Sequence, residues 1–439
     1  MTDAAMPRCP AAPTTAKELY SDEVARCPFP LFSRLQQQGP VHQVDDLPWY
    51  IVTRHEDCSQ VLANAADFSS EHRGFGPAMK AIGMTPPPGV QAEMQRIGGD
   101  RGALFDIVVH QDPPVHTRLR RQLNKLLPAR FARWKPLIEE RSRTLLDALP
   151  AEGELDLIDA YAAPLPIAVI ADMLGLPDDM HAEIRSWSDD VADVSGRQAS
   201  PEIWLKMARA LARQRDYFAA EIRRRIESPT TDLLGDIAAL TVKVDAEAGL
   251  PIAFDEAVEL AVMLLIGGNE TTTQLLSGMI YELATRPGLL ERIRAEPELV
   301  SNVVEEAMRL HTPVQSIMRF CRNDAEIGGL AIPAGAIVSL IVAEASRDPR
   351  VFDDPDAFDP ERPNARRHLG FSTGIHHCSG ADLTRSEGRI ALRHFCETFE
   401  TIALARDGAV RYDRATLIIK GMTRLGIRYL KRDRRAAEG

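Results

Sequence analysis

The segment from residue 254 to residue 286 limits the possible folds of this chain more than any other. Its spacing is helical, and residues 260–266 are apolar on every side, which is typical of a helix buried through the centre of a large protein. Gly267 and Gly268 follow within the same pattern, although each glycine costs a helix interior about 1 kcal/mol relative to alanine. The sequence therefore predicts a central helix with a local defect.

The composition excludes several classes of protein. The 439 residues allow about three domains or one large enzyme, and 45% hydrophobic with 26% charged residues is ordinary for a globular protein. A net charge of −11 argues against nonspecific nucleic-acid binding. Six scattered cysteines favour a reducing compartment. No apolar run approaches the roughly 20 residues that span a bilayer, and we expect a soluble, cytoplasmic protein.

Hydrophobic periodicity predicts a mainly α fold with small β-sheets at its edges. Irregular chain is predicted over residues 72–112, as a binding loop, lid or disorder, and over residues 347–377. Helices are predicted over residues 54–68, 115–126, 129–149, 165–174, 179–194, 201–227, 254–286, 298–311 and 380–398. Strands are predicted over residues 41–44, 49–53, 325–327, 330–332, 336–342, 402–404 and 417–419.

A cysteine stands at the start of the last long predicted helix. Cys378 lies between Gly374 and Gly380, in the stretch Phe-Ser-Thr-Gly-Ile-His-His-Cys-Ser-Gly that begins at Phe371. A helix amino terminus stabilises a thiolate, and glycines let a flat partner approach the backbone. Hydrogen bonds to the sulfur also tune the potential of a metal thiolate. An isolated cysteine of this kind is more often simply buried, but other motifs accompany this one.

An acid and a hydroxyl follow the two glycines of the central helix. Glu270 and Thr271 would lie deep in the protein, where a carboxylate needs a partner or water. The glycines leave room for a ligand against the helix, and the adjacent acid and hydroxyl are suited to relaying protons. The alternative is a helix that ends at the glycines, but the apolar residues from Leu275 to Leu283 favour its continuation.

Two further pairs lie on predicted helices. Glu306 and Arg309 are three residues apart, a spacing that is usual for a surface salt bridge. His116 and Arg120 are four apart on one helix face, where they would either grip a carboxylate or face solvent. Neither pair identifies a function by itself.

Together and in this order, the motifs resemble soluble bacterial cytochromes P450, which are haem-thiolate monooxygenases. The resemblance runs from about residue 40 to residue 430. The haem loop is matched by Phe371, Gly374, His376, Cys378 and Gly380, and the oxygen-activating helix by Gly267, Gly268, Glu270, Thr271 and Thr272. Glu306 and Arg309 match the Glu-x-x-Arg pair of the family, and Arg362 resembles the third member of its ion network.

The resemblance implies a role for each of these residues. Cys378 would be the axial thiolate ligand of haem b, with Gly268, Phe371, Gly374 and Gly380 beside the cofactor. Thr271 is expected to hydrogen-bond dioxygen, and Glu270 to gate protons through water. The donors expected to hold the haem propionates are His116, Arg120, Arg319 and His376. The expected structural ion network consists of Glu306, Arg309 and Arg362.

The resemblance also implies an organisation and an activity. One large domain with a long central helix over the haem is expected at residues 31–430, after a loosely ordered lead-in at residues 1–30 and before a charged tail at residues 431–439. The domain would insert one oxygen atom from O2 into a hydrophobic small organic substrate. Electrons would come from an external ferredoxin and an NAD(P)H-dependent ferredoxin reductase.

The resemblance also predicts a docking face for a redox partner and a substrate pocket. Basic residues expected near the thiolate side predict a docking face for an acidic ferredoxin. They are Arg118, Arg121, Lys125, Arg130, Arg133, Arg385 and Arg389. The substrate pocket is expected to be lined by residues 74–108, 314–317 and 417–419 with Met263 and Leu264, which are largely apolar.

The sequence departs from the family pattern at two places and leaves rival interpretations. Ser372 stands where glycine is common, which predicts a slightly tighter approach to the haem loop, and residues 70–112 are longer than expected. A zinc cluster of His368, His376, His377 and Cys378 is one rival. Another is a haem-binding protein of this fold that acts as a non-hydroxylating binding module or sensor. Dehydrogenation, dealkylation and oxidative coupling remain alternatives to hydroxylation.

Overall fold

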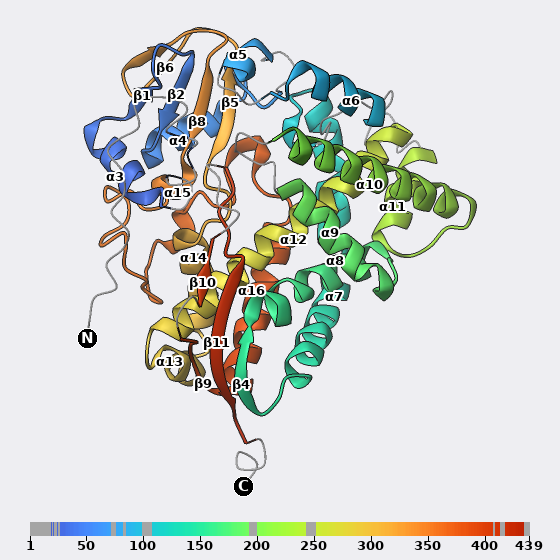
Figure 1. The fold of residues 1–439 in the computed structure, drawn as a ribbon, viewed down its shortest axis with the longest axis vertical. Helices are drawn as coiled ribbons and strands as arrows, with labels where there is room; N and C mark the ends of the chain where they lie inside the picture. Colours follow the sequence, from blue (N-terminus) through green and yellow to red (C-terminus); the bar gives the residue numbers. More distant parts are fainter. Residues whose placement is uncertain are drawn as a thin grey trace.

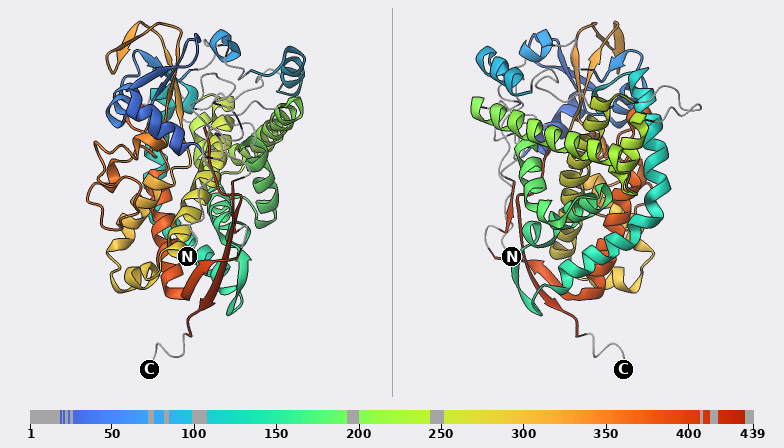
Figure 2. Two further views of the ribbon diagram at one scale, coloured as in Figure 1. Left: turned by 60° about the vertical axis from the view of Figure 1, so that its left-hand side comes forward. Right: turned by 90° about the vertical axis from the view of Figure 1, so that its right-hand side faces the viewer.

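The central helix organises the fold. The computed structural model describes residues 19, 21, 24, 27–71, 76–81, 85–98, 108–192, 200–242, 252–406, 409–412 and 418–433. Helix α12 (Phe254–Thr285) runs through the middle of the molecule and packs on α8, α10, α14 and α16 (Figures 1 and 2). It continues without a break through Gly267 and Gly268, as predicted. At its start, the Ala253 N–H donates to the Glu256 carboxylate at 2.7 Å, which satisfies one of the free donors of the first turn.

The helices around α12 largely match those expected. They are α7 (Val115–Asp147), α8 (Pro164–Leu174), α9 (His181–Ala192), α10 (Pro201–Glu227), α11 (Leu233–Val242), α13 (Leu289–Ala295), α14 (Leu299–Leu310) and α16 (Ala381–Thr398). The predicted break after residue 126 is wrong, because α7 continues through Pro128 and Pro136. Packing against α8 and α16 offsets the hydrogen bonds that the two prolines remove.

The expectation of irregular chain over residues 72–112 is also wrong for much of that range. Helices α5 (Gly76–Ala81) and α6 (Pro88–Gly98) lie within it, and a 3-10 turn spans Val108–His110. The last of the three prolines is the first residue of α6, a position where its missing N–H removes no helical bond. Helix α6 packs on α10 and buries Met94 completely.

A five-stranded sheet forms the part of the molecule beside this helical core (Figure 1). Its order is β1 (Val41–Gln43), β2 (Trp49–Val52), β8 (Ile337–Leu340), β5 (Ile317–Cys321) and β3 (Phe68–Ser69). Strands β2 and β8 are parallel, and the other neighbours are antiparallel. One helix was predicted over residues 54–68. Helix α4 instead spans only His55–Ala63, and β3 begins at Phe68. Helices α3 (Phe29–Gln38) and α15 (Val342–Ala345) lie beside this sheet and close to one another.

Smaller sheets complete the fold class, which is mainly α as predicted. The first contains β4 (Glu152–Asp156), β9 (Phe399–Leu404), β10 (Val410–Arg411) and β11 (Arg424–Lys431). The second pairs β6 (Ala325–Ile327) with β7 (Leu330–Ile332). The predicted strand 417–419 is reduced to one bridge between Ile419 and Val314, while Leu417 lies outside the described residues. Most of the expected lead-in and residues 434–439 also lie outside them.

The segment between α15 and α16 has little regular structure, as predicted. It contains two 3-10 turns, η6 (Ala365–Arg367) and η7 (Gly374–His376). A one-turn π-helix, η4 (Ile158–Ala162), precedes α8. Among the described helices, none is long and apolar enough to cross a bilayer.

Candidate active site

The loop before α16 presents the sulfur of Cys378. Its backbone N–H donates to the Phe371 carbonyl at 2.9 Å, which closes the loop, and its side chain is exposed. The surrounding protein raises the pKa of the thiol by desolvation, whereas backbone N–H groups of Gly380 and Ala381 and the charge of Arg120 lower it. The loop thus offers an accessible sulfur toward which N–H donors point.

Two backbone positions in this loop have a left-handed conformation. Gly374 has φ +70°, and a Cβ there would lie 2.5 Å from the Leu62 carbonyl oxygen. Ser372, where glycine is common in the family, has φ +58°. Its hydroxyl oxygen is buried without a hydrogen-bond partner in the described part of the chain. Serine at position 372, in place of the glycine that is common in the family, therefore strains the backbone locally.

The four predicted propionate ligands come from three elements, α7, β5 and η7, and lie beside this loop. The rings of His116, on α7, and His376, in η7, have centroids 4.2 Å apart. Arg120, one turn after His116, donates to the His377 carbonyl. Burial, followed by the charge of Arg319, lowers the pKa of His376 to about 3.

Arg319 lies on β5 and is 6% exposed. Burial lowers its pKa to about 10, partly offset by Asp112. Burial and Arg120 also lower the pKa of His116, whose Nδ1 has no hydrogen-bond partner among the described residues. The cluster of His116, Arg120, Arg319 and His376 therefore contains two neutral histidines and two arginines whose described hydrogen bonds go to backbone carbonyls, not to carboxylates.

A network that the sequence analysis missed supports this cluster. Ser70 Oγ lies 3.0 Å from His376 Nε2, and the Ser70 N–H donates to Asp112 at 3.0 Å. Asp112 also accepts hydrogen bonds from Ser69 and Arg322. The Phe-Ser-Ser stretch that contains these serines gives no sign of this network in the sequence. The partners of Ser69 and Ser70 lie about 40 and 300 residues away along the chain.

One face of α12 is open in the middle of the protein. Gly267 is exposed, and a Cβ at this position would meet no atom of the described residues within 4 Å. Thr271 is one turn later on the same face, and its hydroxyl donates to the Gly267 carbonyl at 2.8 Å. Gly268 instead faces α8, where its Cβ would lie 3.6 Å from Ile170. The sequence analysis named Gly268 as the cofactor glycine, but the space lies at Gly267.

Glu270 lies on another side of α12 and borders a polar cavity of about 250 Å³. Its carboxylate accepts a hydrogen bond from Gln274 at 2.9 Å, and Gln274 also bonds the backbone of Met422. Arg185 and Asp189 of α9 line the same cavity. The predicted acid is thus adjacent to a space that can hold water, on a different side of the helix from Thr271.

The three residues of the expected ion network are in contact and buried. Glu306 and Arg309 form two hydrogen bonds, of 2.7 and 2.8 Å, and Arg362 bonds the same carboxylate at 2.9 Å. Burial raises the pKa of Glu306, but the bonds from Arg309 and Arg362 outweigh it and leave the pKa below its ordinary value. Arg309 also donates to the carbonyls of Ser346, Pro355 and Ala357.

A second buried ion network adjoins the first and was not predicted. Glu305 bonds Arg385 at 2.7 Å and His368 at 3.2 Å. These two groups lower the pKa of Glu305 to about 2, although burial acts in the opposite direction. The Arg385 guanidinium also lies 4.5 Å from the centre of the Phe371 ring. Arg385 therefore supports the cysteine loop from within.

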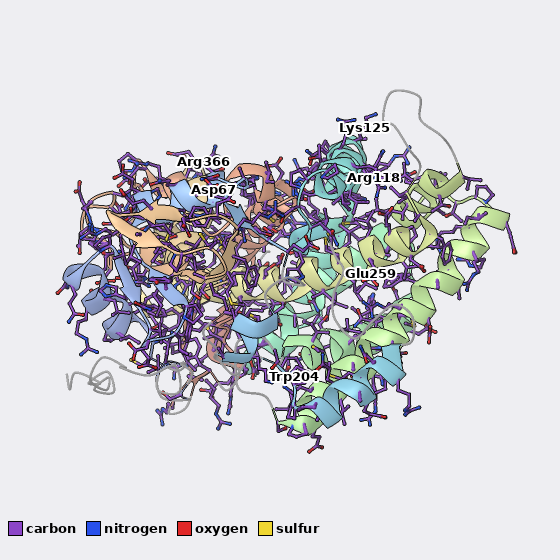
Figure 3. All side chains as sticks on the ribbon, turned by 90° about the horizontal axis from the view of Figure 1, so that it is seen from above. Asp67, Arg118, Lys125, Trp204, Glu259 and Arg366 are labelled. Atoms are coloured by element: carbon purple, nitrogen blue, oxygen red, sulfur yellow. The ribbon has the colours of Figure 1, made fainter. Side chains whose placement is uncertain are left out.

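Three of the arginines expected on the docking face have acidic partners inside this protein. Besides Arg385, Arg118 binds Glu256 at 2.9 Å and Arg130 binds Asp236 at 2.6 Å. A basic cleft of about 310 Å³ lies beside the cysteine loop instead. Its lining includes His55, Arg366, Arg367, Phe371, His377 and Arg385. Figure 3 shows Arg366 and Lys125 on one side of the molecule and Trp204 on the opposite side.

The four residues of the zinc rival do not converge. His368 contacts Glu305, whereas His376 contacts Ser70 and His116. No group of three or more His, Cys, Asp or Glu side chains in the described ranges is arranged to hold a metal ion.

Comparison with known proteins decides the family. The model of the cytochrome P450 family matches residues 197–418, about half of the chain. The chain is 30% identical to 6-deoxyerythronolide B hydroxylase of Saccharopolyspora erythraea over 422 residues, covering 94% of this chain and 99% of that protein. The chain belongs to the cytochrome P450 family. It is thus an oxidoreductase of the monooxygenase class, and the family implies a haem with a cysteine thiolate ligand.

Further members of the P450 family are similar to this chain over most of its length. Cytochrome P450 monooxygenase PikC of Streptomyces venezuelae is 32% identical over 415 residues, covering 93% of this chain and 92% of that protein. The structure of cytochrome P450 CYP109Q5 from Chondromyces apiculatus superposes with a TM-score of 0.80 at 30% identity, covering 94% of this chain and 98% of the other. The P450 fold and the mainly α class expected from the sequence are both confirmed.

Proposed function

We propose that this P450 inserts one oxygen atom from O2 into a bulky, hydrophobic organic substrate, with haem b held by Cys378 and electrons supplied by a ferredoxin. The observation that carries the proposal is the accessible Cys378 sulfur, with N–H donors directed at it from the start of α16. The other oxygen atom leaves as water. The thiolate-bound haem supplies the chemistry that activates oxygen.

The residues near Cys378 fit a haem on three counts. The sulfur is exposed. In the cluster of His116, Arg120, Arg319 and His376, the described hydrogen bonds of the two arginines go to backbone carbonyls, and two propionates would supply carboxylates through charge-assisted hydrogen bonds. The face of α12 at Gly267 has no side chain from the described ranges within 4 Å of an added Cβ, which leaves room for a flat ligand.

The remaining residues have roles in handling protons and substrate. Thr271 presents a hydroxyl on the open face of α12, where it would hydrogen-bond dioxygen after releasing the Gly267 carbonyl. Glu270 would pass protons from the polar cavity that it borders. Met263 and Leu264, both partly buried, would line the substrate side. The relative from Saccharopolyspora erythraea, whose name specifies a hydroxylase of a deoxyerythronolide, supports a large substrate and hydroxylation.

An acidic ferredoxin would dock at the basic cleft beside the cysteine loop. Arg366 and Arg367 are exposed there, although Arg366 also lies 3.6 Å from Glu305, and the cleft reaches His377, the neighbour of Cys378. An acidic partner is favoured because opposite charge steers encounter, and the cleft leads electrons toward the thiolate side.

The carbon-monoxide difference spectrum of the dithionite-reduced protein tests the proposal. A strongly red-shifted Soret band is expected in the unaltered protein and in a Cys396→Ser control, because Cys396 is buried farther along α16. Cys378→Ser should lose that band. A Soret band of the histidine-ligated type in the unaltered protein, or no bound haem, would overturn the proposal.

A further inference from the structure

Glu387 is a buried acid that none of the roles above uses. It lies on α16 and is 2% exposed, and its Oε2 has no hydrogen-bond partner in the described part of the chain. Burial is the cause that raises its pKa, to about 8. A carboxyl group in this environment is neutral at neutral pH and ionises only at the cost of placing a charge in a poorly polarisable interior.

The groups that face Glu387 do not compensate a negative charge. The charge of Glu387 contributes to the raised pKa of Tyr161, from η4, which bonds Ser142 of α7 at 2.6 Å, and Ser142 bonds His394 at 2.9 Å. Burial lowers the pKa of His394 to about 4 and raises that of Tyr161, so both are neutral near pH 7. On the α12 side, Thr384, three residues before Glu387 on α16, contacts Thr272 at 3.4 Å.

The charged residues of the neighbouring elements are engaged elsewhere. On the α14 side, Arg385 binds Glu305. Toward α13 and β9, Arg294 donates to the carbonyls of Cys396 and Phe399. Arg393 pairs with Glu139 of α7 near the surface. The ionisation of Glu387 is therefore governed by burial and responds to any charge added inside the protein.

Helix α16, which begins just after the cofactor ligand, carries this acid. The helix begins at Ala381, three residues after Cys378, and Glu387 is six residues farther along. Six residues correspond to a rise of about 9 Å. Across an interior of low polarisability, a change of one charge near the start of α16 acts on a buried titratable group of the same helix with little screening.

We propose that Glu387 is a proton-binding site coupled to electron uptake at the haem. One electron from the external donor reduces the iron, and the ionised Glu387 carboxylate takes up one proton from solvent to become a carboxylic acid. The net charge of the interior is then unchanged, and no other bond is made or broken. This inference rests on the proposed function, because it requires a haem on Cys378.

The midpoint potential of the bound haem, measured from about pH 6 to about pH 10, tests this coupling. In the unaltered protein, the potential should be constant at the acidic end and fall as the pH rises through the pKa of Glu387. Glu387→Gln should remove that fall. Glu344→Gln is the matched control, because Glu344 is also buried with a pKa of about 8 but lies on α15, against α3 and α4.

Either of two results would overturn the coupling: an unaltered protein whose potential does not vary in this range, or a Glu387→Gln protein that still varies like the original. If Glu387→Gln does not retain haem, redox-difference infrared spectroscopy of the unaltered protein decides the matter. At a pH above the pKa of Glu387, reduction should produce the C=O band of a protonated carboxyl, and its absence would refute the inference. Failure of the proposed function is distinguishable, because the thiolate-type carbon-monoxide spectrum would then be missing.

Discussion

At the scale of single residues, two buried arginines differ in the groups that accept their hydrogen bonds. Arg309 is fully buried and bonds Glu306 and three backbone carbonyls. Arg319 is nearly as buried, but its described hydrogen bond is to the Met318 carbonyl at 2.9 Å, and burial lowers its pKa to about 10. A buried guanidinium without a bonded carboxylate requires an anion from outside the chain. This contrast separates a structural arginine from one that is suited to a ligand.

The hydroxyl of Thr271 should control how efficiently electrons form product. Thr271→Ala removes the hydroxyl from the open face of α12 and should lower the product formed per NAD(P)H by roughly tenfold or more, with peroxide or water in its place. Thr271→Ser retains the hydroxyl and should stay close to the original. Product yield and peroxide measured in the same reactions check this, and unchanged coupling in Thr271→Ala would refute the assigned role.

A methyl group at Gly374 should destabilise the cysteine loop. The left-handed backbone costs an alanine about 1–2 kcal/mol, and the contact of its Cβ with the Leu62 carbonyl oxygen adds to this cost. Gly329→Ala provides the control, because Gly329 has φ +83° but an added Cβ there would meet nothing within 4 Å in the part of the chain that the structure describes. Thermal unfolding and haem retention should both decrease more in Gly374→Ala. Equal losses in the two variants would show that the contact is unimportant.

The buried carboxyl of Glu344 should make stability depend on pH. Burial raises its pKa to about 8 from an ordinary value of 4.5. A raised folded-state pKa means that its contribution to the free energy of unfolding is fully present below about pH 4.5 and is lost as the pH rises to about 8. Glu344→Gln should therefore flatten the pH dependence of that free energy in this interval. Denaturant titrations at several pH values measure the effect, and an unchanged slope would contradict it.

At the scale of elements, α14 joins two parts of the chain through adjacent glutamates. Glu306 holds the irregular segment around Arg362, whereas Glu305 holds α16 through Arg385 and the cysteine loop through His368. Both carboxylates are buried, so neither ion network is screened by water. Through these two carboxylates, α14 holds both the irregular segment before the Cys378 loop and the side chains that support that loop.

Breaking the Glu306 network should unfold this region rather than alter selectivity. Glu306→Gln leaves two buried arginines without their carboxylate and should cost about 3–5 kcal/mol, with loss of haem. Glu361→Gln removes an exposed partner of Arg292 and should change stability little. Denaturant unfolding and haem content are the measurements. A Glu306→Gln protein with normal stability and haem would count against a structural role.

At the scale of the whole molecule, charge is distributed unevenly for a chain of net charge −11. Arg366 and Arg367 are exposed at the basic cleft beside the cysteine loop, whereas the exposed Arg424, at the start of β11, does not line that cleft. A local positive surface on an acidic protein can direct an acidic partner to one face.

Reversing the charge of the cleft should slow electron delivery. Replacing Arg366 and Arg367 together by glutamate should lower the second-order rate of reduction by an acidic ferredoxin roughly tenfold or more at low salt. The rate for the unaltered protein should fall as salt rises. Arg424→Glu reverses a charge that does not line the cleft and lies 3.9 Å from Asp156, and it should leave the rate unchanged. Stopped-flow reduction measures all three, and equal slowing by both charge changes would argue against a specific cleft.

The sequence by itself determined the central helix, the cysteine loop and most of the surrounding helices. Their signals are local, because apolar spacing marks a buried helix face and glycines with a cysteine mark a tight loop. It failed where local and tertiary preferences conflict. Prolines in α7 and at the start of α6 were interpreted as breaks, although packing against neighbouring helices retains both elements.

Only the tertiary structure decided which residues meet. The cationic cluster joins α7, β5 and η7, whose residues His116, Arg319 and His376 are separated by up to 260 positions. It also showed that Gly267, not Gly268, borders open space, and that Arg385 binds Glu305 within the protein. Periodicity states which face of an element is buried. It does not state what lies against that face, because the partners come from distant segments that packing brings together.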